Sequence, residues 1–389
     1  MIRRVLLLGL LLLLLTAPFS VRAESDISVL NSAVEIDFPN TLIFNLEVES
    51  RADIVDARLH YQVDKMNYAQ VTSEGWPDFA PATTVRTSWS WDMRRSSLPP
   101  GAAISYWWTV VDAAGNRLED TARELCFDDG RYEWRSLTES DTTLYWYEGS
   151  DSFAAELMGV CEQGLARLAQ DIGTYPERPV KIYIYASAGD LQAAMVFPRE
   201  WTGGVAFTEF GIIAIGISPG HLDWGKRALV HELTHLVVHQ ATFSPYGGLP
   251  TWLDEGLAMH NEGELAPSLE ARLENAVAEE NLISVRSLCS PFSAEPEKAY
   301  LSYAESYSLV EYLLRNYGQG EMLDLLTLIK QGNTYDQALT EVYGFDIDGL
   351  DTRWRGTLEV AAGEPAQTVS WSRRGSLVEA CSSFQGGSR

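Results

Sequence analysis

The segment Val230-His-Glu-Leu-Thr-His235 places two histidines four positions apart within an apolar stretch of the sequence. In an α-helix, residues four apart lie on one face about one turn from each other, so both imidazoles can bind the same metal ion. Glu232 lies between them and can accept a proton from a water bound to that ion. The segment therefore predicts a helix that carries two metal ligands, His231 and His235, and a general base, Glu232.

A catalytic zinc ion has three protein ligands and an open position for water, so a third ligand is needed. A histidine six residues after the second one would be the metzincin solution, but that position holds Ala241. His239 follows His231 by eight residues, which is about 12 Å along a helix axis, too far to share an ion whose ligand bonds are about 2 Å long. We therefore exclude both positions.

Glu255, in the segment Pro250-Thr-Trp-Leu-Asp-Glu-Gly-Leu-Ala258, is the better third ligand. It follows His235 by twenty positions, enough for the first helix to end, a loop to turn and a second helix to pack back antiparallel. Gly256 beside it would allow a close helix approach. Asp254 is the alternative ligand. The sequence thus predicts one zinc ion held by His231, His235 and Glu255.

The first 23 residues have the features of a secretory signal peptide. Arg3 and Arg4 precede an apolar run from Val5 to Leu15, and small residues precede a cleavage site after Ala23. A run of eleven apolar residues is too short to span a bilayer, which needs about 20. We expect an exported protein, secreted or at the cell surface, with no transmembrane segment after cleavage.

Residues 24–129 predict a β-sandwich domain. Apolar and polar residues alternate as in half-buried strands, and turn signals such as Asp112-Ala-Ala-Gly115-Asn116 separate the runs. We expect an antiparallel sandwich of immunoglobulin-like type without catalytic residues. The predicted strands are 34–38, 42–48, 56–61 and 104–111.

Residues 130–362 predict an α+β domain whose C-terminal half is helical. Strands at 144–147 and 180–185 flank a helix at 153–172, and the glycine-bracketed segment 204–216 predicts an edge strand along a cleft. The tail, 363–389, is rich in Ser, Gly and Gln, which predicts disorder. Further helices are expected at 226–240, 251–261, 268–282, 304–317, 321–330, 335–343 and 350–360.

Charge and cysteine content limit the partners and the covalent structure. The net charge of −25 argues against nucleic acid and anionic membranes, since both need clustered positive charge. Four cysteines lie far apart, without a C-x-x-C pair. Disulfides and free thiols both remain open for Cys126, Cys161, Cys289 and Cys381.

Taken together, the segments 231–235 and Trp252-Leu-Asp-Glu255-Gly resemble the gluzincins, especially the aminopeptidase N-like group and the peptidase MA family of metallohydrolases. The resemblance covers about residues 130–360 and implies a zincin-type catalytic domain acting on peptides or proteins. It extends to Ser302-Tyr303-Ala-Glu-Ser-Tyr307, in which the family's oxyanion-stabilising tyrosine falls on Tyr303. Tyr307, one helical turn on, is the alternative.

Two departures from the family pattern bear on specificity and support of the site. The aminopeptidase segment G-x-M-E-N, whose glutamate binds the free N-terminus of the substrate, is not reproduced at 204–211, where Glu209 is displaced. This favours an endopeptidase over an aminopeptidase. The carboxylate that supports the metal ligands in thermolysin-type members, four residues after the third ligand, is replaced by Met259.

Two other functions share much of this pattern. An extracellular binding or scaffold protein could carry a structural or degenerate zinc site, although such a site needs no general base at position 232. A zinc hydrolase acting on non-peptide substrates would use the same ligands. We therefore expect an exported zinc peptidase in which Glu232 activates water, and keep these as alternatives.

Overall fold

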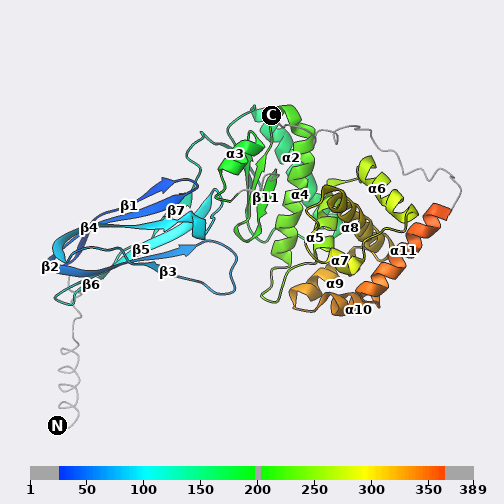
Figure 1. The fold of residues 1–389 in the computed structure, drawn as a ribbon. Coiled ribbons are helices and arrows are strands. Elements are labelled where there is room, and N and C mark those ends of the chain that lie inside the picture. The colour runs from blue at the N-terminus through cyan, green and yellow to red at the C-terminus, as the bar shows by residue number, and fades with distance from the viewer. Residues whose placement is uncertain (1–25, 198–202, 364–389) are drawn as a thin grey trace, which may run out of the picture.

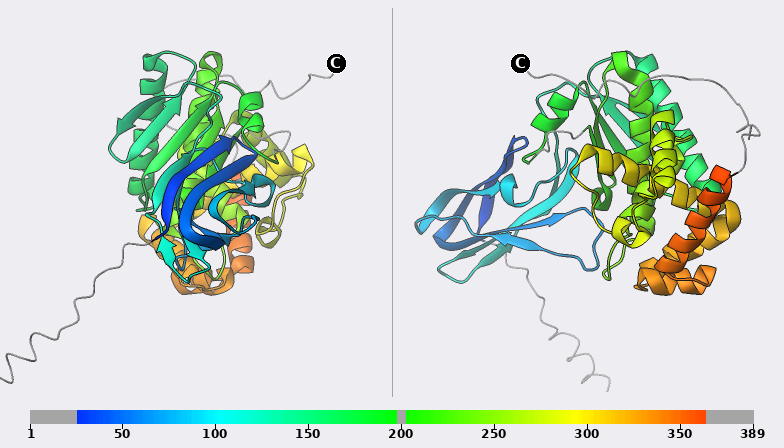
Figure 2. Two further views of the ribbon diagram at one scale, coloured as in Figure 1. Left: turned by 90° about the vertical axis from the view of Figure 1, so that its left-hand side faces the viewer. Right: turned by 45° about the vertical axis from the view of Figure 1, so that its right-hand side comes forward.

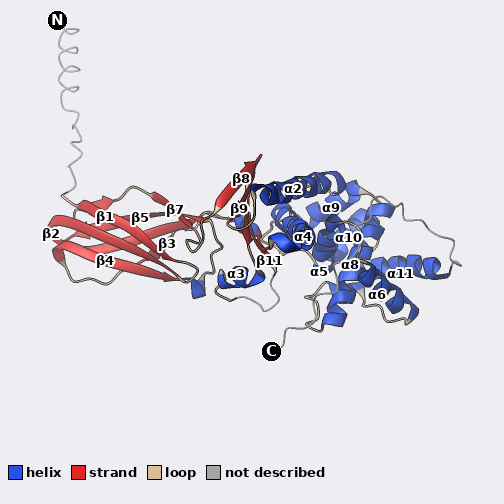
Figure 3. Ribbon diagram, turned by 90° about the horizontal axis from the view of Figure 1, so that it is seen from above, coloured by secondary structure: helices blue, strands red, loops and turns tan. Residues whose placement is uncertain are grey.

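The computed structural model describes residues 26–197 and 203–363. Its N-terminal part is all β and its C-terminal part is mostly helical, with a second sheet between them (Figures 1 and 3). The N-terminal strands are β1 (Ser28–Asp37), β2 (Thr41–Val63), β3 (Ser73–Gly75), β4 (Ala82–Asp92), β5 (Ala102–Asp112), β6 (Arg117–Glu119) and β7 (Arg123–Phe127).

The long strand β2 organises the N-terminal sheet. Its first half pairs with β1 and β4, and its second half pairs with β3 and β5, always antiparallel. Alternate residues of the first half, Leu42, Phe44, Leu46 and Val48, are buried, as a strand with one face on a core requires. The hairpin predicted at 112–116 joins β5 to β6, and Gly115 has a φ of +85°.

The antiparallel β-rich N-terminal region is confirmed, but its strands are connected differently from the predicted sandwich. The two runs expected at 42–48 and 56–61 form one continuous strand, because each half of β2 finds its own hydrogen-bonding partners. All seven strands consequently belong to one hydrogen-bonded sheet. The immunoglobulin-like topology stays a prediction.

The second sheet has the strand order β11-β12-β10-β9-β8. Its three central strands are parallel, and an antiparallel strand lies at each edge. The prediction of one edge strand over 204–216 is wrong, because this segment forms two strands. The first, β11, lies at an edge of the sheet, and the second, β12, is internal. The strands are β8 (Arg135–Glu139), β9 (Thr142–Trp146), β10 (Val180–Tyr185), β11 (Gly204–Phe207) and β12 (Ile212–Gly216), with the 3-10 turn η2 (Thr208–Phe210) between the last two.

Both faces of this second sheet are buried. Ile182, Ile184 and Ile215 pack into the helical core, whereas Tyr183 and Tyr185 pack into the core shared with the N-terminal sheet. Side chains alternate between the faces of a strand, so burial on both faces gives the nearly continuous apolar sequence of these strands. The N-terminal sheet and the second sheet therefore share one hydrophobic cluster.

The helical part surrounds the metal-motif helix, α4. The predicted helices are present, and several boundaries differ: α8 begins eight residues earlier than expected, at Pro296 in its first turn, α4 begins four residues earlier, α11 extends three residues further at each end, and α6 ends at Ala278. Figure 2 shows the helices other than α3 on the far side of the second sheet from the N-terminal strands, whereas Leu191 of α3 packs into the core shared with those strands. The helices are α2 (Asp151–Asp171), α3 (Ala188–Ala193), α4 (Leu222–Ala241), α5 (Thr251–Glu262), α6 (Pro267–Ala278), α7 (Val285–Leu288), α8 (Pro296–Asn316), α9 (Gln319–Lys330), α10 (Tyr335–Tyr343) and α11 (Ile347–Gly363).

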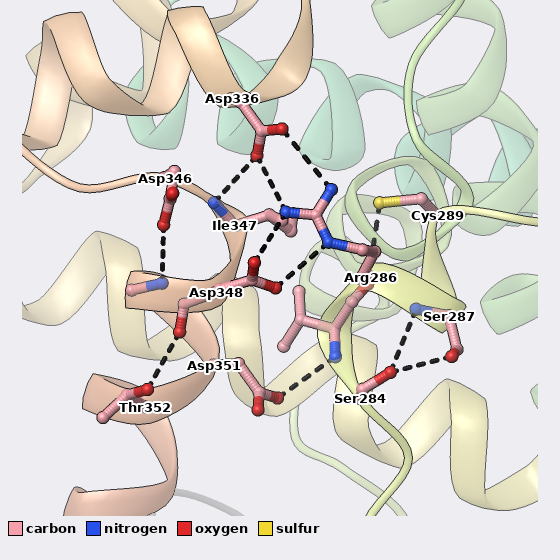
Figure 4. A network of polar contacts seen from close by, with 12 residues as sticks. Ser284, Arg286, Ser287, Cys289, Asp336, Asp346, Ile347, Asp348, Asp351 and Thr352 are labelled. Carbon is pink, nitrogen blue, oxygen red and sulfur yellow. Dashed lines mark hydrogen bonds and ion pairs between the residues drawn. The ribbon is translucent and has the colours of Figure 1, made fainter.

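The short helix α7, which the sequence did not predict, fastens the C-terminal helices to the site helices (Figure 4). Arg286 forms ion pairs with Asp348 and Asp336, and Asp351 accepts a hydrogen bond from the backbone N–H of Val285. At the other end of α7, the carbonyl of Cys289 accepts a hydrogen bond from the backbone N–H at the start of α5. The C-terminal helices thereby brace the helix that carries Glu255.

The predicted signal peptide (1–23) and nearly all of the predicted disordered tail lie outside the described residues. None of the described helices combines the length and the hydropathy needed to cross a lipid bilayer. Cys126, Cys161 and Cys289 are free thiols, and Cys381 lies outside the described ranges.

Candidate active site

Helix α4 presents the two predicted histidines side by side on one face. Leu229, Leu233 and Leu236 on its other face are fully buried and hold the helix in the core. The two Nε2 atoms of His231 and His235 are 3.0 Å apart. Both lone pairs are thus directed at one small region beside the helix.

Helix α5 brings Glu255 to the same region. Its Oε2 lies 3.4 Å from Nε2 of His231 and 3.6 Å from Nε2 of His235. This oxygen is buried and has no hydrogen-bond partner. The ligand atoms of the three residues lie within 4.8 Å of one another, so they could hold a metal ion.

Gly256 explains how α5 can carry Glu255 so close to its neighbours. A Cβ at this position would lie 2.4 Å from the backbone oxygen of Ser306 in α8. Only glycine permits this approach without a shift of one helix. The close helix contact that the sequence suggested is therefore made with α8.

Each histidine also donates its Nδ1–H to a carboxylate. His231 bonds to Glu262 at 2.7 Å, and His235 bonds to Asp254 at 2.8 Å. Such bonds fix the ring orientation and leave Nε2 free as a ligand. Asp254, the alternative third ligand in the sequence, thus lies behind His235, while Glu255 faces both Nε2 atoms.

Glu262 has a role that the sequence reading missed. The position four residues after Glu255, where a supporting carboxylate would be expected, holds Met259. Glu262 follows Glu255 by seven residues, which is two helical turns and therefore the same face of α5. The seven-residue spacing is therefore the feature of the sequence from which the position of Glu262 beside the site could have been predicted.

His239 lies one turn beyond His235 and bonds to the second oxygen of Asp254 at 2.8 Å. Asp254 therefore bridges the two imidazoles. His235, His239 and Asp254 also meet the geometric criterion for a metal group, but their hydrogen bonds satisfy one another. We assign His239 to the support of His235.

The general base predicted at Glu232 lies against the edge strand. A Cβ on Gly204 would be 2.9 Å from Cγ of Glu232, so this glycine lets the strand approach the carboxylate. The backbone N–H of Ala206 donates a hydrogen bond to Glu232. Burial raises the pKa of Glu232, against the lowering effects of the neighbouring histidines and of this hydrogen bond.

The two tyrosines of α8 have different surroundings. Burial raises the pKa of Tyr303, and the charges of Glu255, Glu232, Asp254 and Glu262 raise it further. Burial also raises the pKa of Tyr307, to about 12, but the charges that act on it are those of Glu311, Arg315 and Glu264. Tyr303 is thus the tyrosine beside the predicted metal ligands.

The electrostatics of the site favour a cation. Burial alone lowers the pKa of His231, but the neighbouring carboxylates of Glu255 and Glu262 outweigh burial and raise it to about 9. Burial raises the pKa of Glu255, yet the two histidines lower it to about 2. These buried carboxylates thus stabilise positive charge on the imidazoles, and the unpartnered Oε2 of Glu255 completes a donor set of two nitrogens and one oxygen. The residues fit a zinc ion.

Comparison with known proteins defines the class to which this site belongs. The model of the Peptidase MA superfamily matches residues 160–360, which is 201 of the 389 residues. This range includes all the residues described above for the site. The protein therefore belongs to the peptidase MA superfamily, as the sequence resemblance indicated.

Several solved structures are similar to the chain at low sequence identity. Aminopeptidase A of Legionella pneumophila, in complex with aspartic acid, is 11% identical (TM-score 0.39; 85% of this chain, 49% of that one). An aminopeptidase N family protein from Idiomarina loihiensis is 11% identical (TM-score 0.29; 85% and 70%). OgpA from Akkermansia muciniphila is 10% identical (TM-score 0.22; 29% and 31%).

The chain spans less than two thirds of the length of OgpA and of the Legionella enzyme. No curated protein matches it significantly. Because the TM-scores are below 0.5, the family assignment depends on the sequence match and not on these structures.

Proposed function

We propose that this protein is a zinc-dependent peptidase that hydrolyses peptide bonds within polypeptides. The observation that carries the proposal is the convergence of three donor atoms, Nε2 of His231, Nε2 of His235 and Oε2 of Glu255, beside the carboxylate of Glu232. A zinc ion bound there would polarise the scissile carbonyl and lower the pKa of water.

The remaining chemistry belongs to residues of this chain. Glu232 accepts a proton from the attacking water and donates it to the leaving amine. Its raised pKa brings it closer to the range in which it can do both. The hydroxyl of Tyr303 donates a hydrogen bond to the oxyanion that develops on the carbonyl oxygen.

The edge strand offers a place for an extended substrate. Gly203 bonds through its carbonyl to Gly216 of β12, so the alternation of an antiparallel ladder turns the peptide groups of Gly204 and Ala206 away from β12. These outward groups lie next to Glu232. The N–H of Ala206 already bonds to Glu232, and a substrate chain could pair with the other outward groups by β-strand addition.

Internal cleavage is favoured because Glu209, the glutamate of the edge-strand segment among the described residues, is displaced from the position that would receive the N-terminus of a substrate. Glu209, the displaced family glutamate, lies in η2 and its Oε2 forms a 2.6 Å ion pair with Lys65. Its charge is therefore already compensated within the protein. We also propose export, based on the signal-peptide features of residues 1–23.

An unbiased peptide-library digest tests this function. We expect cleavage at internal bonds, loss of cleavage with a zinc chelator and recovery when zinc is restored. Removal of single N-terminal residues would instead indicate an aminopeptidase. A zinc-loaded protein that cleaves no peptide would contradict the proposal and favour a non-peptide substrate or a structural metal site.

A further inference from the structure

A loop of the N-terminal domain reaches the turn that follows the edge strand. This bridging loop, residues 64–72, connects β2 to β3. Lys65 Nζ lies 2.6 Å from Oε2 of Glu209 and 5.8 Å above the ring of Phe210. The backbone N–H of Met66 donates a 2.8 Å hydrogen bond to the carbonyl of Glu209. The bridging loop therefore holds both the side chain and the backbone of the η2 turn.

Two further contacts tie the bridging loop to the catalytic domain. Arg178, just before β10, donates to Asp64 at 2.6 Å and to the Glu209 carbonyl at 3.3 Å. Tyr68 stacks on Phe243, beyond the end of α4, with ring centroids 4.4 Å apart and planes inclined by 10°. The loop thus contacts the η2 turn on one side and the segment following the motif helix on the other.

The position of the η2 turn determines the position of β11. The turn directly follows Phe207, the last residue of the strand, and both Phe207 and Phe210 pack into the cluster shared with the N-terminal sheet. From α4, the side-chain amide of Gln240 donates to the Thr208 carbonyl at 3.3 Å. Because the η2 turn is held from both domains, β11 has little freedom to slide along α4.

The position of β11 affects the general base, Glu232. The N–H of Ala206 bonds to Glu232, and Gly204 lies against the Glu232 side chain. Active-site groups lose activity when their support allows displacements of about 0.5 to 1 Å. A more mobile η2 turn would therefore displace the Glu232 carboxylate, although the bridging loop contacts the turn and not Glu232 itself.

We propose that the N-terminal domain supports the active site. Its bridging loop, through Lys65 and Met66, positions the edge strand that holds Glu232. Lys65 is a positioning residue in this account. The proposal rests on the proposed peptidase function for its kinetic consequence, whereas its structural consequence stands independently.

The test uses the full chain and the variants Lys65→Met, Glu209→Gln and the double variant. Hydrogen exchange of residues 203–211 should speed up about two- to fivefold in each single variant, as expected for a partly exposed ion pair, and no further in the double variant. Lys65→Arg should restore the wild-type rate. Arg51→Met, which removes an exposed ion pair with Asp26 elsewhere in the N-terminal domain, should leave this segment unchanged.

Kinetics supply the second readout. At equal zinc content and equal melting temperature, Lys65→Met should lower kcat severalfold more than it raises KM, and Lys65→Arg should recover kcat. Unchanged exchange of residues 203–211 in Lys65→Met, or additive effects in the double variant, would overturn the proposal. If the wild-type protein cleaves no peptide, the peptidase function fails while the exchange measurement still decides the role of the loop.

Discussion

Glu262 accepts a hydrogen bond from Nδ1 of His231 at 2.7 Å, across 31 positions of the sequence. The other oxygen of Glu262 pairs with Arg227 at 3.2 Å, one turn before His231 in α4. The carboxylate therefore joins the C-terminal end of α5 to the metal-motif helix. This relationship fixes the ring that the account assigns to the metal.

We expect Glu262→Ala to weaken zinc binding about 10- to 100-fold, because the imidazole of His231 loses the partner that orients it. Glu262→Gln should fall between this variant and the wild type, since an amide oxygen can still accept the bond without its charge. Competition with a chelator of known affinity measures the change. The exposed neighbour Glu264, changed to Gln, is the matched control, and equal affinities for Glu262→Ala and Glu264→Gln would refute the role.

The two tyrosines of α8 allow a paired test. Tyr303→Phe should lower kcat about 10²- to 10³-fold, the usual cost of removing one oxyanion donor, at unchanged zinc content. Tyr307→Phe should remain close to wild type, because the charges with the largest effect on the pKa of Tyr307 are those of Glu311, Arg315 and Glu264, outside the predicted metal ligands. Steady-state kinetics on one peptide measure both. A larger loss in Tyr307→Phe would transfer the role to that residue.

Gly256 supports a prediction about folding stability. Gly256→Ala would place a Cβ 2.4 Å from a backbone oxygen of α8, so the variant should lose about 1 to 3 kcal/mol of unfolding free energy. The same change at Gly356, exposed within α11 and with no atom within 4 Å of the added Cβ, should stabilise the protein by up to about 1 kcal/mol. Thermal unfolding of the two variants should therefore shift in opposite directions. Equal shifts would contradict the helix contact.

Glu305, in α8 between the two tyrosines, predicts a pH dependence. It is completely buried, only one of its oxygens has a hydrogen-bond partner, the N–H of Ile283, and burial raises its pKa to about 8. A folded-state pKa above the unfolded value means that the folded protein binds the proton more tightly. The contribution of this proton to the free energy of unfolding is therefore complete below about pH 4.5, and it is lost as the pH rises through 8.

We expect Glu305→Gln to remove this dependence. The variant should have a stability similar to that of the wild type at pH 5 and should be more stable at pH 8.5. Denaturant titrations of both proteins at the two pH values measure the difference. A difference that stays constant between these pH values would show that Glu305 does not titrate as predicted.

Much of the site could be predicted from the sequence because its signals are local. His231, Glu232 and His235 lie within five residues of one helix, and Glu255 lies in an apolar segment at a workable distance. Helical periodicity placed each of them on the correct element. The peptidase MA match confirms the family to which these motifs pointed.

The remaining features depend on contacts between distant segments. The ion pair of Lys65 with Glu209 spans 144 positions, and nothing in the sequence around either residue indicates that they pair. The continuity of β2 likewise depends on different partners for its two halves. The break predicted between residues 48 and 56 is absent because strand pairing continues through it.

The central claim is that a metal held by His231, His235 and Glu255 works with Glu232 as the general base. The most direct measurement compares zinc content and peptide cleavage of the wild type with those of Glu232→Gln, prepared in parallel. We predict a single bound zinc ion in both proteins and a kcat about 10²- to 10⁴-fold lower in the variant. Absence of zinc from the wild-type protein, or equal cleavage by the two proteins, would contradict the claim.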